Sequence, residues 1–101
     1  MTVHIDRLLE QCCKNRASEI RIRPGVPPRI YLRNTFIRAG SRPLTQEDVD
    51  SVIRSVTPDD LQRELAATGK TSFTFHFGEA ASFYVRIQVR ESRCEVVLRP
   101  V

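Results

Sequence analysis

The chain has 101 residues, of which 41% are hydrophobic and 28% are charged. A chain of this length can bury one core but not two, so we expect residues 1–101 to fold as a single domain. The length excludes a complete nucleotide-driven motor or a multidomain enzyme, and no apolar stretch reaches the roughly 18 residues of a membrane span. The 16 basic and 12 acidic residues give a net charge of +4, and every basic residue except Lys14 and Lys70 is arginine.

The cysteines and the N-terminus indicate the compartment. Cys12 and Cys13 are adjacent and Cys94 stands alone, so a thiol stays free and no disulfide framework is indicated, which is typical of a reducing cytoplasm. The N-terminal residues are charged and amphipathic, unlike a signal peptide. His4 and the paired cysteines lack the usual spacing of zinc ligands. We therefore expect a cytoplasmic protein without metal or cofactor, in which one of the paired cysteines faces the core.

The first half of the chain predicts one helix and then short strands. Residues 4–15 have apolar side chains at the spacing of an amphipathic helix. These side chains are Ile5, Leu8, Leu9, Cys12 and Cys13. Residues 19–23 and 29–32 alternate between apolar and polar, which predicts two strands. A third strand is predicted over 35–37, after a tight turn at Asn34, because asparagine tolerates left-handed backbone.

The second half predicts two helices and then three strands. Thr45 is placed to cap a helix whose acidic first turn suits the helix dipole. Its buried stripe is predicted to be Val49, Val52, Ile53 and Val56. Pro58 is expected at the first position of the next helix, and Gly69 is placed to end it. Alternating residues then predict strands within 72–77, 82–90 and 94–99.

The order of these elements, α-β-β-β-α-α-β-β-β, predicts an α+β fold with a mostly antiparallel sheet. Charge is segregated along this order: residues 1–44 carry +6, residues 45–79 carry −4 and residues 80–101 carry +2. If the aliphatic residues and phenylalanines face the helices, arginines and tyrosines gather on the opposite sheet face. This arginine–tyrosine face, our candidate interaction face, consists of Arg21, Arg23, Arg29, Tyr31, Tyr84, Arg86 and Arg90.

Patterns that indicate catalysis are missing from the sequence. Gly69-Lys70-Thr71 lacks the upstream glycine and the preceding strand of a phosphate-binding loop. No spacing of serine, histidine and carboxylate residues suggests a nucleophile with its base. His76 is expected on the polar side of a strand, and the adjacent Asp59 and Asp60 are expected at a helix start. We therefore expect no catalytic residue and no enzyme activity.

Three stretches of the sequence together resemble one family. They are residues 17–25 (ASEIRIRPG) with Pro27-Pro28 following, residues 44–49 (LTQEDV) and residues 69–75 (GKTSFTF). Their order and separation resemble those in the N-terminal domain of type IV pilus retraction ATPases (PilT-like), which are related to the type II secretion ATPases. The similarity extends over residues 4–99.

The resemblance implies a PAS-like domain with helices against one face of an antiparallel sheet. In this family the domain precedes a RecA-like ATPase core and packs against a neighbouring subunit of a hexameric ring. Its movement against that core accompanies nucleotide turnover. The present sequence stops about where the core would start, so the resemblance implies an accessory domain without the motor.

The sequence also departs from the family at positions that concern the nucleotide. The family's R-F-R-V-N strand supplies arginines that can reach nucleotide phosphates across the subunit junction. The matching stretch is residues 82–86 (SFYVR), so Ser82 and Tyr84 replace both arginines. Ser72 replaces an acidic residue of the family, and Arg21 replaces a histidine. This pattern keeps the scaffold and favours a stand-alone relative over a truncated ATPase.

The leading hypothesis is a non-catalytic protein-interaction domain of a bacterial type IV pilus, twitching-motility or secretion system, which binds ATPase subunits or a second copy of itself. One alternative is the N-terminal domain of a full-length hexameric ATPase, which a reading frame continuing past Val101 would indicate. Another is a single-stranded nucleic-acid-binding module that stacks bases on Tyr31 and Tyr84, although the net charge of only +4 argues against it. A ligand cavity in a PAS-like fold is a further alternative, but the apolar residues are only sufficient to fill the core rather than to line a pocket.

Overall fold

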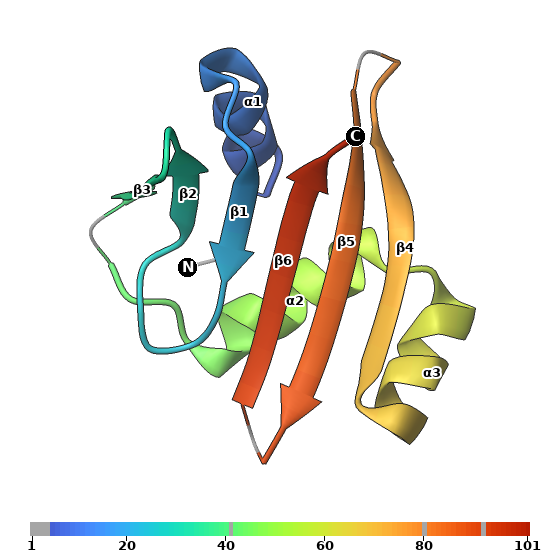
Figure 1. The fold of residues 1–101 in the computed structure, drawn as a ribbon. Helices are drawn as coiled ribbons and strands as arrows, with labels where there is room; N and C mark the ends of the chain where they lie inside the picture. The colour runs from blue at the N-terminus through green and yellow to red at the C-terminus, as the bar shows by residue number, and fades with distance from the viewer. Residues whose placement is uncertain (1–4, 41, 80, 92) are drawn as a thin grey trace.

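A computed structural model describes residues 5–40, 42–79, 81–91 and 93–101, so His4 and its possible zinc site lie outside the described residues. The N-terminal half forms α1 (Ile5–Asn15), β1 (Glu19–Ile22), β2 (Arg29–Leu32) and β3 (Thr35–Arg38). The rest forms α2 (Gln46–Val56), α3 (Asp59–Thr68), β4 (Lys70–Phe77), β5 (Ala81–Arg90) and β6 (Arg93–Pro100) (Figure 1). This order confirms the predicted α+β fold. Within the described ranges, no helix is long and apolar enough to cross a membrane.

The strands form an antiparallel sheet in the order β3-β2-β1-β6-β5-β4. Strand β1 pairs with β6, with Ile20 opposite Leu98 and Ile22 opposite Val96. This pairing joins the N-terminal strands to the C-terminal strands at the middle of the sheet (Figure 1). Side chains from the two halves of the chain therefore become neighbours on each face of the sheet.

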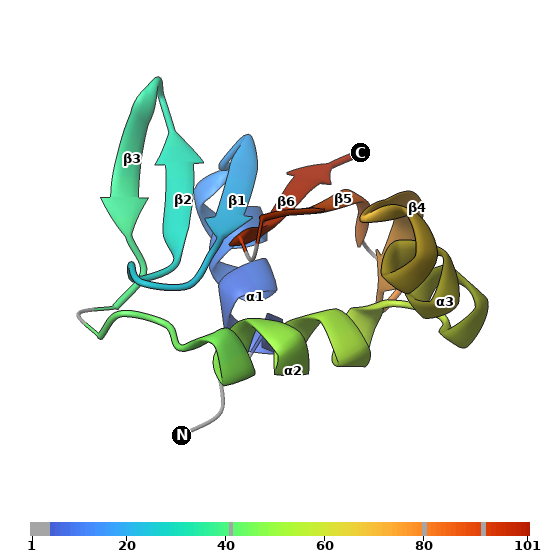
Figure 2. The same ribbon diagram turned by 90° about the horizontal axis from the view of Figure 1, so that it is seen from below.

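The helices lie against one face of this sheet. Figure 2 shows α1 and α2 beneath the sheet, and α3 beside β4 on the same side. The largest fully buried side chains come from α1, α2, β1, β5 and β6 and include Phe83, Leu9, Ile20, Ile22, Ile87, Leu98 and Val49. The core between helices and sheet is thus made by apolar residues at alternate strand positions. The opposite face, which we call the outer face, has no helix over it in the described part of the chain.

The ends of α2 and α3 follow from local sequence. The Thr45 hydroxyl accepts a hydrogen bond from the Asp48 backbone N–H at 3.0 Å, and the Asp48 carboxylate accepts one from the Thr45 N–H at 2.9 Å. This capping box confirms the predicted N-cap, and the predicted stripe of α2 is buried. Helix α3 ends at Gly69, as predicted. Pro58, however, is the residue before α3 rather than its first residue, because its ψ of 150° is extended.

Two expectations about single residues are corrected by the structure. Phe36 does not face the helices: it is 38% exposed and lies opposite Tyr31, whose side chain is on the outer face. Cys13, which the helical spacing placed in the apolar stripe of α1, is exposed, whereas Cys12 is fully buried, which confirms that one of the paired cysteines faces the core. The predicted hairpin turn is confirmed, since Arg33 and Asn34 have φ values of 50° and 65° and so form a two-residue left-handed turn.

Candidate interaction face

The outer face is organised in rows that cross the strands. The register places Arg38, Arg29, Arg21, Val97, Arg86 and Ser72 side by side on successive strands from β3 to β4. Residues that pair across antiparallel strands point to the same face. Arginines from both ends of the chain are therefore brought together on either side of one apolar residue, Val97.

The neighbouring row contains a buried carboxylate that joins two arginines. Glu19 is only 7% exposed. Its carboxylate accepts a hydrogen bond from Arg99 Nε at 2.9 Å and another from Arg21 Nε. Burial by itself would raise the pKa of Glu19, but the hydrogen bonds and positive charges of the two arginines bring it below its ordinary value of 4.5. Glu19 is therefore ionised at neutral pH and holds both guanidinium groups in place.

Aromatic rings and guanidinium groups form a cluster over β1, β2 and β3. The rings of Tyr31 and Phe36 have centroids 4.6 Å apart and are tilted by 55°. The guanidinium carbon of Arg29 lies 4.8 Å from the Phe36 ring centroid, and that of Arg21 lies 5.5 Å away. The buried Arg29 Nε has no hydrogen-bond partner among the described residues. Stacking on an aromatic ring suits the planar guanidinium better than the compact ammonium of lysine.

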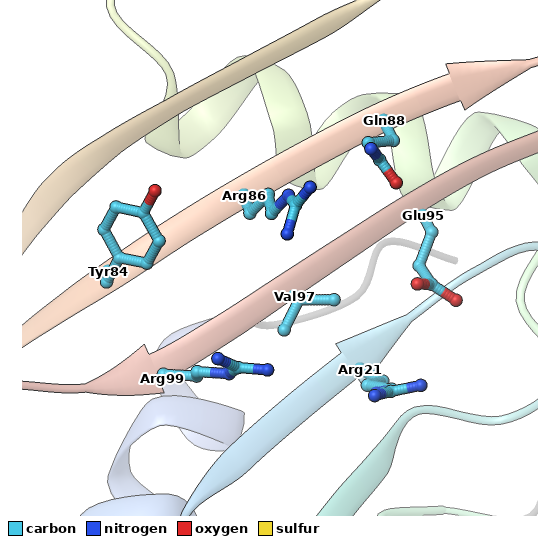
Figure 3. Close-up of a pocket in the computed structure, with 7 residues that line it drawn as sticks. All are labelled: Arg21, Tyr84, Arg86, Gln88, Glu95, Val97 and Arg99. Atoms are coloured by element: carbon cyan, nitrogen blue, oxygen red, sulfur yellow. The ribbon is translucent and has the colours of Figure 1, made fainter.

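A hollow of about 180 Å³ lies beside this cluster, over β1, β6 and β5. It is lined by Arg21, Tyr84, Arg86, Gln88, Glu95, Val97 and Arg99 (Figure 3). Figure 3 shows Val97 between Arg86 on one side and the side chains of Arg21 and Arg99 on the other. Tyr84 is 43% exposed at one end of the hollow. The hollow thus combines an apolar floor with positively charged walls.

The structure brings together most of the predicted arginine–tyrosine face. Arg21, Arg29, Tyr31, Tyr84 and Arg86 belong to the two central rows. Arg23 directly follows β1, and Arg90 lies at the end of β5 opposite Arg93. Both line a second, larger hollow of about 610 Å³ at that end of the sheet. The prediction therefore describes the centre of the face and one of its margins rather than one continuous patch.

Sequence reasoning did not include Glu19, Phe36, Val97 and Arg99 in this face. Glu19 alternates with buried Ile20, and Val97 and Arg99 alternate with buried Val96 and Leu98. That alternation was a usable signal for their orientation. Their mutual contacts had no such signal, because Arg99 and Glu19 are 80 residues apart in the chain.

Comparison with known proteins identifies structures that share this fold. No protein-family model and no curated protein matches the sequence. The pilus retraction motor PilT with bound ADP superposes with a TM-score of 0.85 at 21% identity, over 96% of this chain and 29% of that chain. The fold is that of the N-terminal domain of such ATPases.

Two further solved structures show the same likeness. The Legionella pneumophila ATPase DotB has a TM-score of 0.81 at 20% identity, over 96% of this chain and 28% of its own. The Yersinia pseudotuberculosis ATPase DotB has a TM-score of 0.79 at 16% identity, over 99% of this chain and 31% of its own. The chain spans less than a third of the length of each of these structures, and identities this low establish the fold alone.

Proposed function

We propose that this chain is a non-catalytic interaction domain of a pilus retraction or secretion ATPase system, and that the outer face is its contact surface. One observation carries the proposal: no helix of the described residues covers the outer face, which gathers Arg21, Arg29, Tyr84 and Arg86 around Val97. Arginine and tyrosine are enriched at protein interfaces because each combines a large contact area with a polar end. The partner is an ATPase subunit or a second copy of this chain.

The internal contacts of the face also suit a docking surface. Glu19 fixes Arg21 and Arg99, and Phe36 stacks against Arg29. Side chains that are already held in place lose less conformational entropy when a partner binds. A partner would therefore meet a surface on which Arg99 and Phe36 are exposed but already in contact with neighbouring side chains, and on which Tyr84 and Arg86 are exposed as well.

The test is a binding measurement with a variant of the outer face and a matched variant of the helical side. We expect Tyr84→Ala to weaken, by about tenfold or more, the complex with pilus retraction or secretion ATPases of the same organism, or self-association, since tyrosines at interface centres often contribute this much. Arg63→Ala, on the exposed side of α3, is the control and should bind normally. Sedimentation velocity provides the measurement. A chain that stays monomeric and forms no complex with such ATPases would overturn the proposal.

The nucleic-acid alternative receives less support from the geometry. Tyr31 packs against Phe36 rather than standing free, so Tyr84 is the more accessible tyrosine, at 43% exposure. Base-stacking platforms use several exposed rings along one strand path. A titration with single-stranded RNA at low salt separates the two proposals, because phosphate contacts produce a steep salt dependence.

A further inference from the structure

The hollow over β1, β6 and β5 contains arginines in two different states. Arg21 and Arg99 both donate hydrogen bonds to Glu19, so a carboxylate already shares their charge. Arg86 lies opposite Val97 on β6 and Ser72 on β4. Among the described residues, no hydrogen bond, ion pair or ring contact involves its guanidinium. Arg86 is therefore an exposed donor without an acceptor, beside two guanidinium groups that are held in place.

The net charge of the hollow suits a bound group that carries a single negative charge. Arg21, Arg86 and Arg99 bring three positive charges to the hollow. The carboxylates of Glu19 and Glu95 offset two of these charges, so that a net charge of about +1 remains. A carboxylate carries one negative charge and accepts two parallel hydrogen bonds from an arginine. A phosphate dianion or a nucleotide would bring more negative charge than the hollow balances, next to Glu95.

The other lining groups also fit a carboxylate on a short aliphatic stem. Val97 provides an apolar floor between Arg86 and the pair formed by Arg21 and Arg99 (Figure 3). The Tyr84 hydroxyl at the end of the hollow is a further donor. An aspartate or glutamate side chain has one or two methylene groups to lay on Val97 and one carboxylate to reach Arg86.

We propose that this hollow receives one carboxylate side chain of a partner protein, with Arg86 as its main contact. The proposal rests on the proposed function, because it names the chemistry of the partner at the same face. The Arg21–Glu19–Arg99 bridge acts as the support that keeps the hollow open and limits its charge. The partner therefore presents an exposed aspartate or glutamate to the outer face.

The probes are a capped Ala-Glu-Ala peptide, its Ala-Gln-Ala counterpart, inorganic phosphate and ADP. Each is titrated into the ¹⁵N-labelled chain while the arginine Nε–Hε and backbone amide signals are followed by NMR. We expect the Glu peptide to shift the Arg86 and Val97 signals saturably, with affinity in the millimolar range. The Gln peptide, phosphate and ADP should each bind at least about tenfold more weakly, as expected for the loss of one charge-assisted pair.

Two variants test the contact itself. Arg86→Gln should weaken binding of the Glu peptide by about tenfold, because the bidentate donor is lost. Arg63→Gln removes an exposed arginine of α3 that does not line this hollow, and it should bind like the unmodified chain. The inference is wrong if the Glu peptide produces no saturable shift, if Arg86→Gln leaves its affinity unchanged, or if phosphate or ADP binds more tightly than the Glu peptide.

Failure of this inference and failure of the proposed function give different results. If the protein complex is lost in Tyr84→Ala but survives in Arg86→Gln, the outer face is the contact surface and the carboxylate site is wrong. If the Glu peptide binds through Arg86 but no protein complex or self-association is detected, the carboxylate site holds and the proposed function fails. Self-association that is lost in Arg86→Gln supports both and makes a second copy of the chain the source of the carboxylate.

Discussion

Glu19 is the residue on which the centre of the outer face depends. A buried carboxylate is costly unless its oxygens are hydrogen-bonded to groups of opposite charge. Here one oxygen accepts from Arg21 and the other from Arg99, which lies on the neighbouring strand β6. The bridge therefore does two things, since it satisfies a buried charge and ties β1 to β6.

Replacement of Glu19 by glutamine should lower the free energy of unfolding at pH 7 by about 1–3 kcal/mol, because both arginines lose a charged acceptor. The pKa of Glu19 in the fold lies below 4.5, so this stabilisation is complete above pH 4.5 and is lost as the pH falls through the lowered pKa. The difference between the two proteins should therefore shrink at pH 3. Urea denaturation at both pH values measures it.

Glu10→Gln is the control for this experiment, because Glu10 is exposed on α1. It should change the unfolding free energy little at either pH. A loss in Glu19→Gln that is equally large at pH 3 would contradict the assignment, since the stabilisation from the ionised carboxylate declines as the pH falls below 4.5.

At the scale of elements, Gly69 couples the end of α3 to the start of the β4–β5 pair. Its φ is +81°, and its N–H donates to the Leu65 carbonyl at 2.8 Å to end the helix. Its own carbonyl accepts from the Val89 N–H at 2.7 Å, which begins the pairing of the C-terminal strands. One left-handed residue thus allows α3 to turn directly into the sheet.

Gly69→Ala should destabilise the protein by more than the 1–2 kcal/mol or so that a left-handed backbone costs an alanine. The added Cβ would lie 3.1 Å from the Val89 carbonyl oxygen, so a backbone atom has to move. Gly78→Ala is the matched control, because Gly78 has a φ of +65° but no atom within 4 Å of the added Cβ. Chemical denaturation of both variants measures the difference. Equal losses in the two variants would show that the contact with Val89 is unimportant.

At the scale of the whole molecule, one core joins α1, α2 and the sheet. Cys12 of α1 and Cys94 of β6 are both buried, while Cys13 is exposed. Burial, with a smaller effect from the neighbouring Cys13, raises the pKa of Cys12 to about 11. Burial and the charge of Asp50 raise the pKa of Cys94 to about 11. These thiols therefore report whether the helices separate from the sheet.

Thiol labelling of the native protein at pH 8 should modify Cys13 rapidly and leave Cys12 and Cys94 unmodified, because neither buried sulfur is accessible or ionised. The buried thiols should react together with global unfolding in denaturant, as members of one cooperative core. Mass spectrometry after timed labelling with a maleimide measures this. The Cys13→Ser variant should show no fast labelling. Fast reaction of Cys12 in that variant would contradict the packing of α1 against the sheet.

Much of the fold could be predicted because the signals for it are local. The Thr45 cap, the turn at Asn34 and the left-handed Gly69 depend on a few consecutive residues, and each was predicted from them. Pro58 was predicted as the first residue of α3 but is the residue before it. The sequence alone does not separate these two positions, because the proline ring is sterically compatible with both. Alternation also predicted which arginines and tyrosines point away from the core.

What the sequence by itself determined is the type of each element and the face on which most strand side chains lie. Only the tertiary structure decided which side chains are neighbours. The β1–β6 pairing sets Arg21 beside Val97 and brings Arg99 to Glu19, and the β2–β3 register turns Phe36 outward against Arg29. The physical reason is that alternation fixes a side chain's face within one strand, whereas strand order depends on non-local packing of the whole core. Arginines that contribute to the chain's net charge of +4 therefore form one surface only through the pairing of strands that are distant in the sequence.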